Sequence, residues 1–236
     1  MILEEGLAKL GLLQARVQKL LELYIKEIEL FNPAYGLVKV QDRRELVVKH
    51  ILDSLAPLNI LINHLKNKPE KSKIGDVGSG AGLPGIPLAV CMPDVEFTLI
   101  ERMGRRAGFL RDAIAVMGLS NVIVKEADLG EINLSAEECF DIVVFRAFSK
   151  LESGIIEGLF RILAPDGILA SYKGRRQLIE EEISRLESRG GKNLSPGSQP
   201  ALPKGIQWEI FPLEVPFLEE ERHLVLIRPA LQVRSF

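Results

Sequence analysis

The chain has 236 residues and a formal net charge of −2, with 47% hydrophobic and 26% charged residues. This ordinary globular composition excludes disordered, collagen-like and fibrous proteins. A slightly acidic chain is not an obvious nucleic-acid binder, so any RNA or DNA site has to come from local clustering of basic residues. The two separated cysteines, Cys91 and Cys139, exclude a disulfide framework and a cysteine-based zinc site.

The N-terminus shows no basic region followed by a cleavage site, and no apolar run approaches the ~18–20 residues of a membrane span. We therefore expect a cytoplasmic protein that neither crosses a membrane nor binds a metal. We also expect a monomer.

The first part of the chain predicts helices. Apolar residues recur at three- and four-residue spacing over residues 1–30, which predicts one helix that Pro33 ends. Asp42 is the expected N-cap of a second helix over residues 43–55, with Glu45 as its capping-box partner. A third, short helix is expected over residues 58–66. We interpret residues 1–68 as an N-terminal helical extension of a domain that covers residues 69–236.

Strands and helices alternate after residue 73. Helices are expected over residues 104–118, 151–163 and 175–188, a turn at Pro165-Asp166-Gly167, and a loop over residues 190–205. Strands are expected over residues 74–78, 95–101, 122–125, 141–145, 168–172, 206–213 and 223–228. This alternation predicts an α/β fold with a seven-stranded, mainly parallel sheet covered by helices on both faces.

A glycine-rich run follows the first of these strands, reading Asp-Val-Gly-Ser-Gly-Ala-Gly-Leu-Pro-Gly from Asp76 to Gly85. Open α/β sheets bind nucleotide-like ligands at such a strand-to-helix turn. Gly78, Gly80 and Gly82 allow a tight turn and a close approach of the ligand to the backbone. Glu101 ends the next strand, where its carboxylate could accept hydrogen bonds from a ribose diol.

Two ligands compete for this turn. Residues 80–85 match the dinucleotide fingerprint, with Glu101 as its acidic residue, which would make the chain an NAD(P)-dependent oxidoreductase. Asp76 argues against that ligand, because an acid at the turn repels a pyrophosphate. S-adenosylmethionine has no phosphate, and its positive sulfonium and ammonium groups suit an acid at this place.

The glycine-rich run, continued by Ile-Pro-Leu to Leu88, resembles the first motif of the RsmG methyltransferases, also called glucose-inhibited division protein B. Four further stretches resemble motifs of the same family in the right order. They are Lys49 to Leu55, Phe140-Asp141 through Arg146-Ala147-Phe148, Tyr172-Lys173-Gly174, and Glu221 to Val225.

The resemblance implies a Rossmann-like class I fold that depends on S-adenosylmethionine, and methyl transfer to guanine N7 in the 530 loop of 16S ribosomal RNA. It implies that Gly78 and Leu83 contact the cofactor, that Ala127 and Asp128 lie near the adenine, and that Arg146 lies near the methionine end. The chain departs from the family where it has Gly36-Leu37-Val38, Glu126 and Asp128, and the first two departures bear on contacts with the substrate.

Methylation of guanine N7 needs no catalytic base, because N7 offers a lone pair and carries no proton. Neither cysteine stands where a pyrimidine-C5 methyltransferase needs its nucleophile. The Asn/Asp-Pro-Pro-aromatic motif that is typical of adenine amino methylation is missing after the fourth strand, where the chain reads Arg146-Ala147-Phe148-Ser149. A catalytically degenerate relative that binds RNA or the small ribosomal subunit without turnover remains the alternative function.

Basic residues follow the expected carboxyl ends of the strands. Arg146, Lys173 and Arg175 are the candidate contacts to the RNA backbone. Arg222 and His50 lie in the family-like motifs and complete the candidate substrate site. His50 has a second interpretation, as a buried imidazole that Asp53 orients and that joins the helical part to the sheet.

Overall fold

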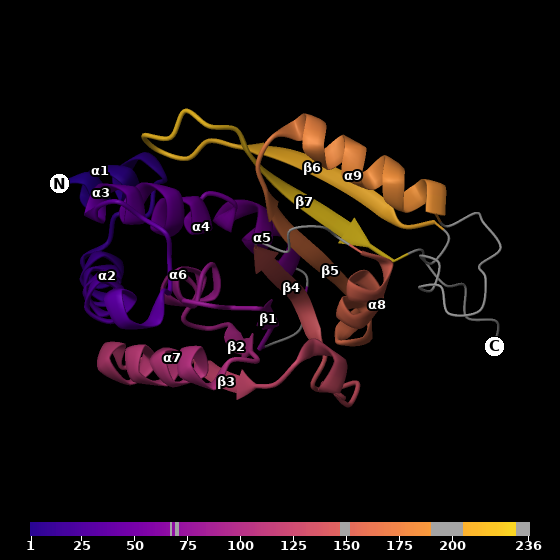
Figure 1. The fold of residues 1–236 in the computed structure, drawn as a ribbon, viewed down its shortest axis with the longest axis horizontal. Coiled ribbons are helices and arrows are strands. Elements are labelled where there is room, and N and C mark those ends of the chain that lie inside the picture. The colour runs from indigo at the N-terminus through magenta and orange to yellow at the C-terminus, as the bar shows by residue number, and fades with distance from the viewer. Residues whose placement is uncertain (67, 69–70, 147–151, 190–204, 230–236) are drawn as a thin grey trace.

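The computed structural model describes residues 1–66, 68, 71–146, 152–189 and 205–229. Seven strands form one sheet, and helices cover both of its faces (Figure 1). Along the chain they are β1 (Lys73–Val77), β2 (Glu96–Glu101), β3 (Val122–Glu126), β4 (Phe140–Arg146), β5 (Leu163–Lys173), β6 (Gln207–Leu213) and β7 (Arg222–Arg228). The prediction of an α/β fold with a seven-stranded, mainly parallel sheet is confirmed.

The strand order is β3-β2-β1-β4-β5-β7-β6, and only the pairings of β7 are antiparallel. The chain builds outward from β1 in one direction and then continues from β4 in the other. Ligands of open α/β sheets bind in the crevice at such a reversal, outside the carboxyl ends of the strands. The crevice of this molecule therefore lies beside the ends of β1 and β4.

Two hydrophobic cores fill the faces of the sheet. One core joins the N-terminal helices to the face of β1, β2 and β4, with Leu21, Ile51 and Leu99 fully buried in it. The other core packs Ile156 and Leu159 against the opposite face. The helices are α1 (Ile2–Lys9), α2 (Ala15–Tyr35), α3 (Arg43–Leu46), α4 (Asp53–Leu55), α5 (Leu58–Leu65), α6 (Gly85–Cys91), α7 (Gly104–Met117), α8 (Ser153–Arg161) and α9 (Arg176–Arg189).

The single helix expected over residues 1–30 is wrong, because the structure has two helices there. Gly11 adopts a φ of 70°, and the Leu12 N–H bonds back to the carbonyl of Leu7, which closes α1. Pro33 does not end α2. It lies in the last turn, where a proline removes only one helical hydrogen bond, and the left-handed Gly36 caps the helix instead.

The helix expected over residues 43–55 is present, but its middle is not α-helical. Asp42 caps it as predicted, accepting from the Glu45 N–H at 2.7 Å. The Glu45 carboxylate accepts from the N–H of Gln41 rather than from that of Asp42. Val47–Leu52 forms a π-helical segment between α3 and α4. Such segments are uncommon and concentrate at functional sites, and this one carries Lys49 and His50.

The remaining elements follow the prediction closely, with one difference in β5. The Pro165-Asp166-Gly167 turn falls inside this strand, where the ladder with β4 jumps from Leu163 opposite Phe140 to Ile168 opposite Ile142. Most of the loop expected over residues 190–205 lies outside the described residues, as do Ala147 and Phe148. The division at residue 68 stays a prediction.

Candidate functional site

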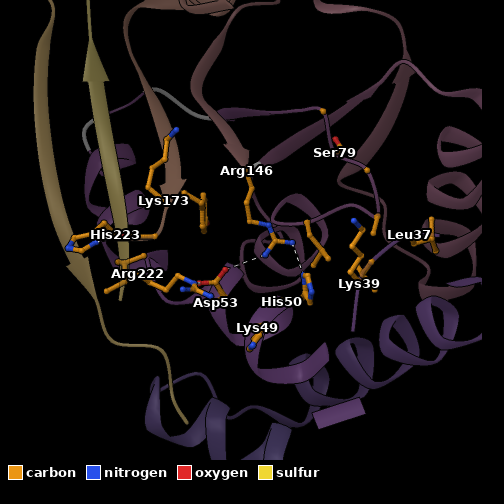
Figure 2. Close-up of a pocket in the computed structure, with 18 of the residues that line it drawn as sticks. Leu37, Lys39, Lys49, His50, Asp53, Ser79, Arg146, Lys173, Arg222 and His223 are labelled. Carbon is orange, nitrogen blue, oxygen red and sulfur yellow. Dashed lines mark hydrogen bonds and ion pairs between the residues drawn. The ribbon is translucent and has the colours of Figure 1, made fainter. Parts of the chain in front are cut away.

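A cavity of about 510 Å³ opens at the carboxyl ends of the parallel strands (Figure 2). Its walls come from segments far apart in the sequence, so no single motif defines it. They are Leu37–Lys39 before α3, Lys49, His50 and Asp53 from the helical part, Gly78–Ala81 and Leu83 from the glycine turn, Arg106 from α7, Arg146 from β4, Tyr172–Gly174 from β5, and Leu213, Arg222 and His223 from the last two strands.

The glycines of the turn have different roles. Gly80 has a φ of 57°, and the atoms nearest to a Cβ placed on it are the Gly78 carbonyl oxygen at 3.9 Å and Arg106 Nη1 at 4.0 Å, so its flank is open. Gly82 does not line the cavity; a side chain there would collide with Ile86 and Leu110. The open flank at Gly80 suits a ligand that approaches the backbone. The glycine at position 82 is required by packing.

Glu101 holds the glycine turn in place. One carboxylate oxygen accepts from the N–H of Gly80 at 2.8 Å, and the other accepts from the N–H of Met103 at 2.9 Å. The side chain is buried and does not line the cavity. Each carboxylate oxygen keeps a further lone pair, so the predicted contact to a ribose stays a prediction, and a supporting role for the turn is added to it.

Asp76 is a buried carboxylate in β1 that does not line the cavity, and one of its two oxygens has no hydrogen-bond partner among the described residues. Its Oδ2 accepts from the N–H of Gly85 at 2.9 Å, whereas its Oδ1 is buried without a partner among the described residues. Burial raises the pKa of Asp76 to about 7, while the Gly85 hydrogen bond and the Arg146 charge oppose the shift. A buried acid with a vacant oxygen fits a cationic ligand group such as an ammonium or a sulfonium.

Ala127 and Asp128 follow β3, on the far side of β2 from the crevice. Neither residue lines the cavity, and the Asp128 carboxylate accepts from the N–H of Gly130 at 3.0 Å. The N–H of Ala127 donates to the backbone carbonyl of Glu101 at 3.2 Å, so the structure places this pair beside one of the other predicted cofactor residues. Their contact to the adenine remains a prediction from the family resemblance.

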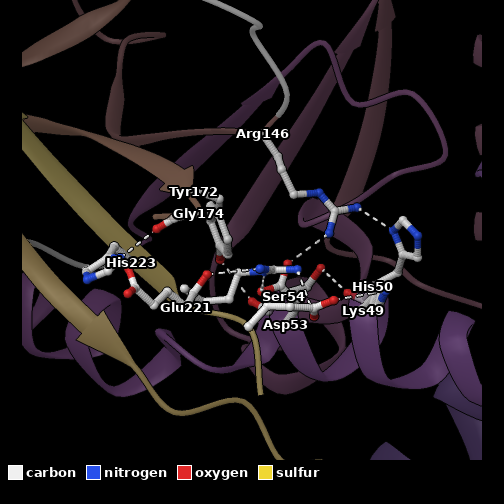
Figure 3. A network of polar contacts seen from close by, with 11 residues as sticks. Lys49, His50, Asp53, Ser54, Arg146, Tyr172, Gly174, Glu221 and His223 are labelled. Carbon is white, nitrogen blue, oxygen red and sulfur yellow. Dashed lines mark hydrogen bonds and ion pairs between the residues drawn. The ribbon is translucent and has the colours of Figure 1, made fainter. Parts of the chain in front are cut away.

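Arg146 ends β4 and reaches across the crevice to the helical part (Figure 3). Its Nη1 donates to Asp53 Oδ2 at 3.3 Å, and its Nη2 lies 3.1 Å from Nδ1 of His50. Asp53 was expected to orient His50; the structure instead shows both side chains contacting the guanidinium of Arg146. Arg146 therefore joins the helical part to the sheet at the mouth of the cavity.

Asp53 holds a second arginine from the other end of the chain. Arg222, at the start of β7, places its Nε 3.3 Å from Asp53 Oδ1, in an ion pair that lacks good hydrogen-bond alignment. The Asp53 side chain is only 6% exposed, and those of Arg146 and Arg222 are 18% and 23% exposed. One buried carboxylate therefore fixes two partly exposed guanidiniums that line the cavity.

The predicted rim cations of β5 and α9 differ from one another. Lys173 lines the cavity, but its Nζ is paired with Glu182 of α9 at 2.8 Å and its side chain is 14% exposed. Lys173 is therefore a paired and partly buried cation in the wall of the cavity. Arg175 is exposed and does not line the cavity.

The cavity has a strongly positive lining in an acidic chain. Its described lining residues include six lysines and arginines and one carboxylate, that of Asp53. Lys39, Lys49 and Arg106 belong to this set and were not predicted as site residues. Lys49 stands beside His50 in the family-like stretch from Lys49 to Leu55, and Arg106 belongs to an arginine-rich stretch after β2. Lys39 carried no signal of its own.

A buried tyrosine connects the helical part to the glycine turn. The hydroxyl of Tyr24 in α2 donates to the carbonyl of Ala81 at 2.6 Å. The hydroxyl of Tyr172 donates to the carbonyl of Ser54 at 2.9 Å, which makes a second link of this kind. The N-terminal helices thus shape the walls of the cavity as well as packing on the sheet.

The described helices include none with the length and apolarity that a bilayer crossing requires. Nor do the described residues bring together three His, Cys, Asp or Glu side chains as a metal ion would need.

Solved methyltransferase structures share the fold. A putative O-methyltransferase from Klebsiella pneumoniae has a TM-score of 0.53 and 12% identity, covering 92% of this chain and 90% of that chain. A precorrin-6y C5,15-methyltransferase from Geobacter metallireducens has a TM-score of 0.50 and 16% identity, covering 73% of this chain and 87% of that chain. At this identity the likeness shows the fold, and it confirms the Rossmann-like methyltransferase architecture.

Relatives found by sequence share much higher identity with this chain than these solved structures do. The ribosomal RNA small subunit methyltransferase G of Treponema denticola is 34% identical, covering 96% of this chain and 93% of the relative. The same enzyme of Treponema pallidum is 38% identical, covering 88% and 83%, and that of Stenotrophomonas maltophilia is 34% identical, covering 95% and 92%.

A family model described as rRNA small subunit methyltransferase G matches residues 17–191. Together with the fold, this assignment confirms S-adenosylmethionine as the cofactor. It also overturns the oxidoreductase alternative. The chain belongs to the RsmG family of small-subunit ribosomal RNA methyltransferases.

Proposed function

We propose that the chain transfers the methyl group of S-adenosylmethionine to N7 of a guanine in the 530 loop of 16S ribosomal RNA. One observation carries the RNA part: among the described residues, six cations and a single carboxylate line a cavity beside the glycine turn, in a chain whose net charge is −2. Nucleic-acid affinity comes mainly from neutralised phosphates, and this cavity concentrates the cations that contact them.

The residues of the crevice fit the cofactor. Asp76 offers a buried carboxylate oxygen without a partner, and Gly80 offers an open flank. We assign cofactor binding to Asp76, Gly78, Gly80, Leu83 and Glu101, with Arg146 at the methionine end. Bound S-adenosylmethionine supplies a methyl carbon that its sulfonium already activates.

The part of the cavity that would hold the methyl acceptor suits a nucleophilic atom that carries no proton. Asp53, the one carboxylate that lines the described part of the cavity, is tied to two arginines and is therefore not available as a general base. Guanine N7 needs no base, so positioning and electrostatics supply the catalysis. Arg222, Lys173 and Arg175 are assigned to the RNA backbone, and His50 to the target nucleotide.

Mass mapping of modified nucleotides in 16S ribosomal RNA tests the proposal, using cells with and without the protein. The expected result is a 7-methylguanosine in the 530 loop that disappears with the protein. Loss of a methyl group elsewhere would overturn the assignment of the nucleotide. An unchanged pattern would favour the degenerate relative, which binds RNA without turnover. We place this activity in the cytoplasm and assign it to a monomer.

A further inference from the structure

His50 and its arginine partner fix the position of one proton. An arginine guanidinium only donates hydrogen bonds, so Nδ1 of His50 must accept from Nη2 of Arg146, 3.1 Å away. A neutral imidazole that accepts at Nδ1 carries its proton on Nε2. Burial and the Arg146 charge lower the pKa of His50 to about 4, which keeps the ring neutral near pH 7.

The Nε2–H of His50 is available to a ligand. The residue lines the cavity, and its Nε2 has no hydrogen-bond partner among the described residues. This nitrogen is not one of the polar atoms that are fully buried without a partner, so it is accessible. In Figure 3 the imidazole stands at one end of the network, beyond the guanidinium of Arg146. The cavity therefore contains a fixed, neutral N–H donor.

We propose that this Nε2–H donates to O6 of the target purine and thereby selects guanine over adenine, an inference that rests on the proposed methylation of guanine N7. O6 lies next to N7 on the same edge of guanine, and adenine presents an amino group there instead. In guanine this N–H can donate to O6, whereas in adenine it would face the amino group, which is itself a donor.

A neutral donor suits this reaction better than the surrounding cations do. Attack by N7 places a positive charge on the purine ring, and a lysine or arginine against O6 would oppose that charge. His50 donates without carrying a charge, and Asp53, which Arg146 shares with Arg222, offsets part of the Arg146 charge behind it.

The second histidine of the cavity has the opposite arrangement. Nδ1 of His223 lies 2.6 Å from the carbonyl of Gly174, which can only accept. Nδ1 of His223 therefore donates, and in the neutral ring Nε2 is an acceptor. Of the two histidines that line the cavity, only His50 presents a neutral N–H at Nε2.

Modified RNA separates reading of O6 from general loss of activity. RNA fragments would carry guanosine, 2,6-diaminopurine riboside or 7-deazaguanosine at the nucleotide that mass mapping identifies. Diaminopurine keeps N7 and replaces O6 by an amino group, whereas 7-deazaguanosine lacks N7. The parent should prefer guanosine to diaminopurine by roughly 10- to 100-fold in kcat/KM, the range of one base-edge contact.

The His50→Phe variant removes the donor. We expect it to slow methylation of guanosine RNA and to leave diaminopurine RNA within about twofold, so that the preference falls towards one. His50→Gln should also lower the preference, because its amide can rotate and present an oxygen to the amino group. His64→Gln, on α5 away from the cavity, is the matched control and should retain the parent preference. Thermal unfolding checks that each variant is folded.

The outcomes are distinguishable. If both His50 variants slow both RNAs equally and keep the parent preference, His50 has a structural role and this inference is overturned alone. If the parent methylates 7-deazaguanosine RNA, or does not methylate guanosine RNA, the proposed function fails and the inference falls with it. A lowered preference, combined with no methylation of 7-deazaguanosine RNA, supports both.

Discussion

Two regions at the crevice differ in charge and in how they hold it: buried carboxylates lie behind the glycine turn, outside the cavity lining, whereas cations line the cavity itself. On the side of β1 and β2, Asp76 and Glu101 are buried carboxylates whose partners are backbone N–H groups. On the side of β4, β5 and β7, Arg146, Lys173 and Arg222 are partly exposed cations whose partners are carboxylates. A cationic cofactor and an anionic polymer can therefore bind next to each other, each facing the charge that suits it.

The largest expected effect concerns the glycine turn, in the region of the buried carboxylates Asp76 and Glu101. Gly80→Val places a β-branched side chain at a φ of 57°, on the open flank of the turn. We expect at least a hundredfold loss of cofactor affinity by titration calorimetry. Gly108→Ala, in the middle of α7 with open space around it, is the control and should bind like the parent. Equal binding by Gly80→Val would mean that the cofactor does not approach this turn.

The next largest effect concerns the cations that line the cavity, and it tests the carboxylate that holds Arg146 and Arg222. Asp53→Asn leaves two guanidiniums without their buried counter-charge, which should lower the free energy of unfolding by about 3 kcal/mol. The low end of the usual range applies because both arginines are partly exposed. Denaturant unfolding measures the change. Glu220→Gln removes an exposed carboxylate near the same Arg222 and should change stability by less than about 1 kcal/mol. Similar losses in both variants would show that the buried bridge has no special role.

The Glu101→Ala variant tests two roles of one buried carboxylate, which holds the glycine turn and is predicted to bind the ribose. Cofactor affinity should fall at least tenfold through the lost ribose contact. The unliganded protein should also melt at a lower temperature, since the N–H groups of Gly80 and Met103 lose a charged acceptor, at roughly 1.5–3 kcal/mol per bond.

The lower melting temperature follows from the two backbone contacts of Glu101, which the sequence does not show. Glu126→Ala is the matched control: it stands opposite Glu101 on β3 and pairs with Arg111 at the surface. It should bind the cofactor like the parent. An unchanged affinity in Glu101→Ala would contradict the ribose contact.

The pH dependence of cofactor binding tests the charge of Asp76. Its pKa is raised to about 7, so the carboxylate becomes charged between pH 6 and 8. Since the charged form attracts a cation, affinity should rise by up to about tenfold over this range. Asp76→Asn should lack this increase, and calorimetry on both proteins separates it from titration of the ligand. Parallel pH profiles would place the cationic groups of the cofactor elsewhere.

The unliganded protein should show the opposite trend in stability. The folded state keeps the Asp76 proton up to about pH 7, whereas the unfolded chain loses it near pH 4. Stability from this group is therefore present below pH 4 and is lost as the pH rises to 7. Asp76→Asn should remove this slope from the difference between the two unfolding curves.

The smallest effect concerns Lys173. If Lys173 contacts an RNA phosphate, Lys173→Ala should reduce the salt slope of RNA binding by about one unit and leave cofactor affinity unchanged. Filter binding across a salt series measures the slope. Arg111→Ala removes a cation on α7 that is paired with Glu126 and does not line the cavity, so its slope should match the parent. Identical slopes for both variants would leave Arg146 and Arg222 as the RNA-facing cations.

The fold could be predicted because its signals are local. Periodic apolar residues, the Asp42 cap and the glycine turn each report on neighbouring residues, and the structure places these elements as expected. The failures come from tertiary context. A proline near the end of α2 is tolerated because Gly36 caps the helix, and the π-helical segment around His50 has no pattern of its own.

The site was predicted less completely because its contacts span the chain. Lys173 lacked an acidic neighbour in sequence, yet Glu182 reaches it from the next helix. Asp53 was assigned to His50, three residues away, whereas its partners are 93 and 169 residues away. Sequence spacing identifies which side chains are available, but only the packed sheet shows which of them meet.

The bridge at Asp53 also has a consequence for synthesis of the protein on the ribosome. Asp53 emerges early, but Arg222 follows 169 residues later, a delay on the order of ten to thirty seconds at typical elongation rates. By the end of that time the helices and the glycine turn have been synthesised, whereas the basic wall still lacks its last strand. We therefore expect the cavity to be completed late, after the cofactor half has formed.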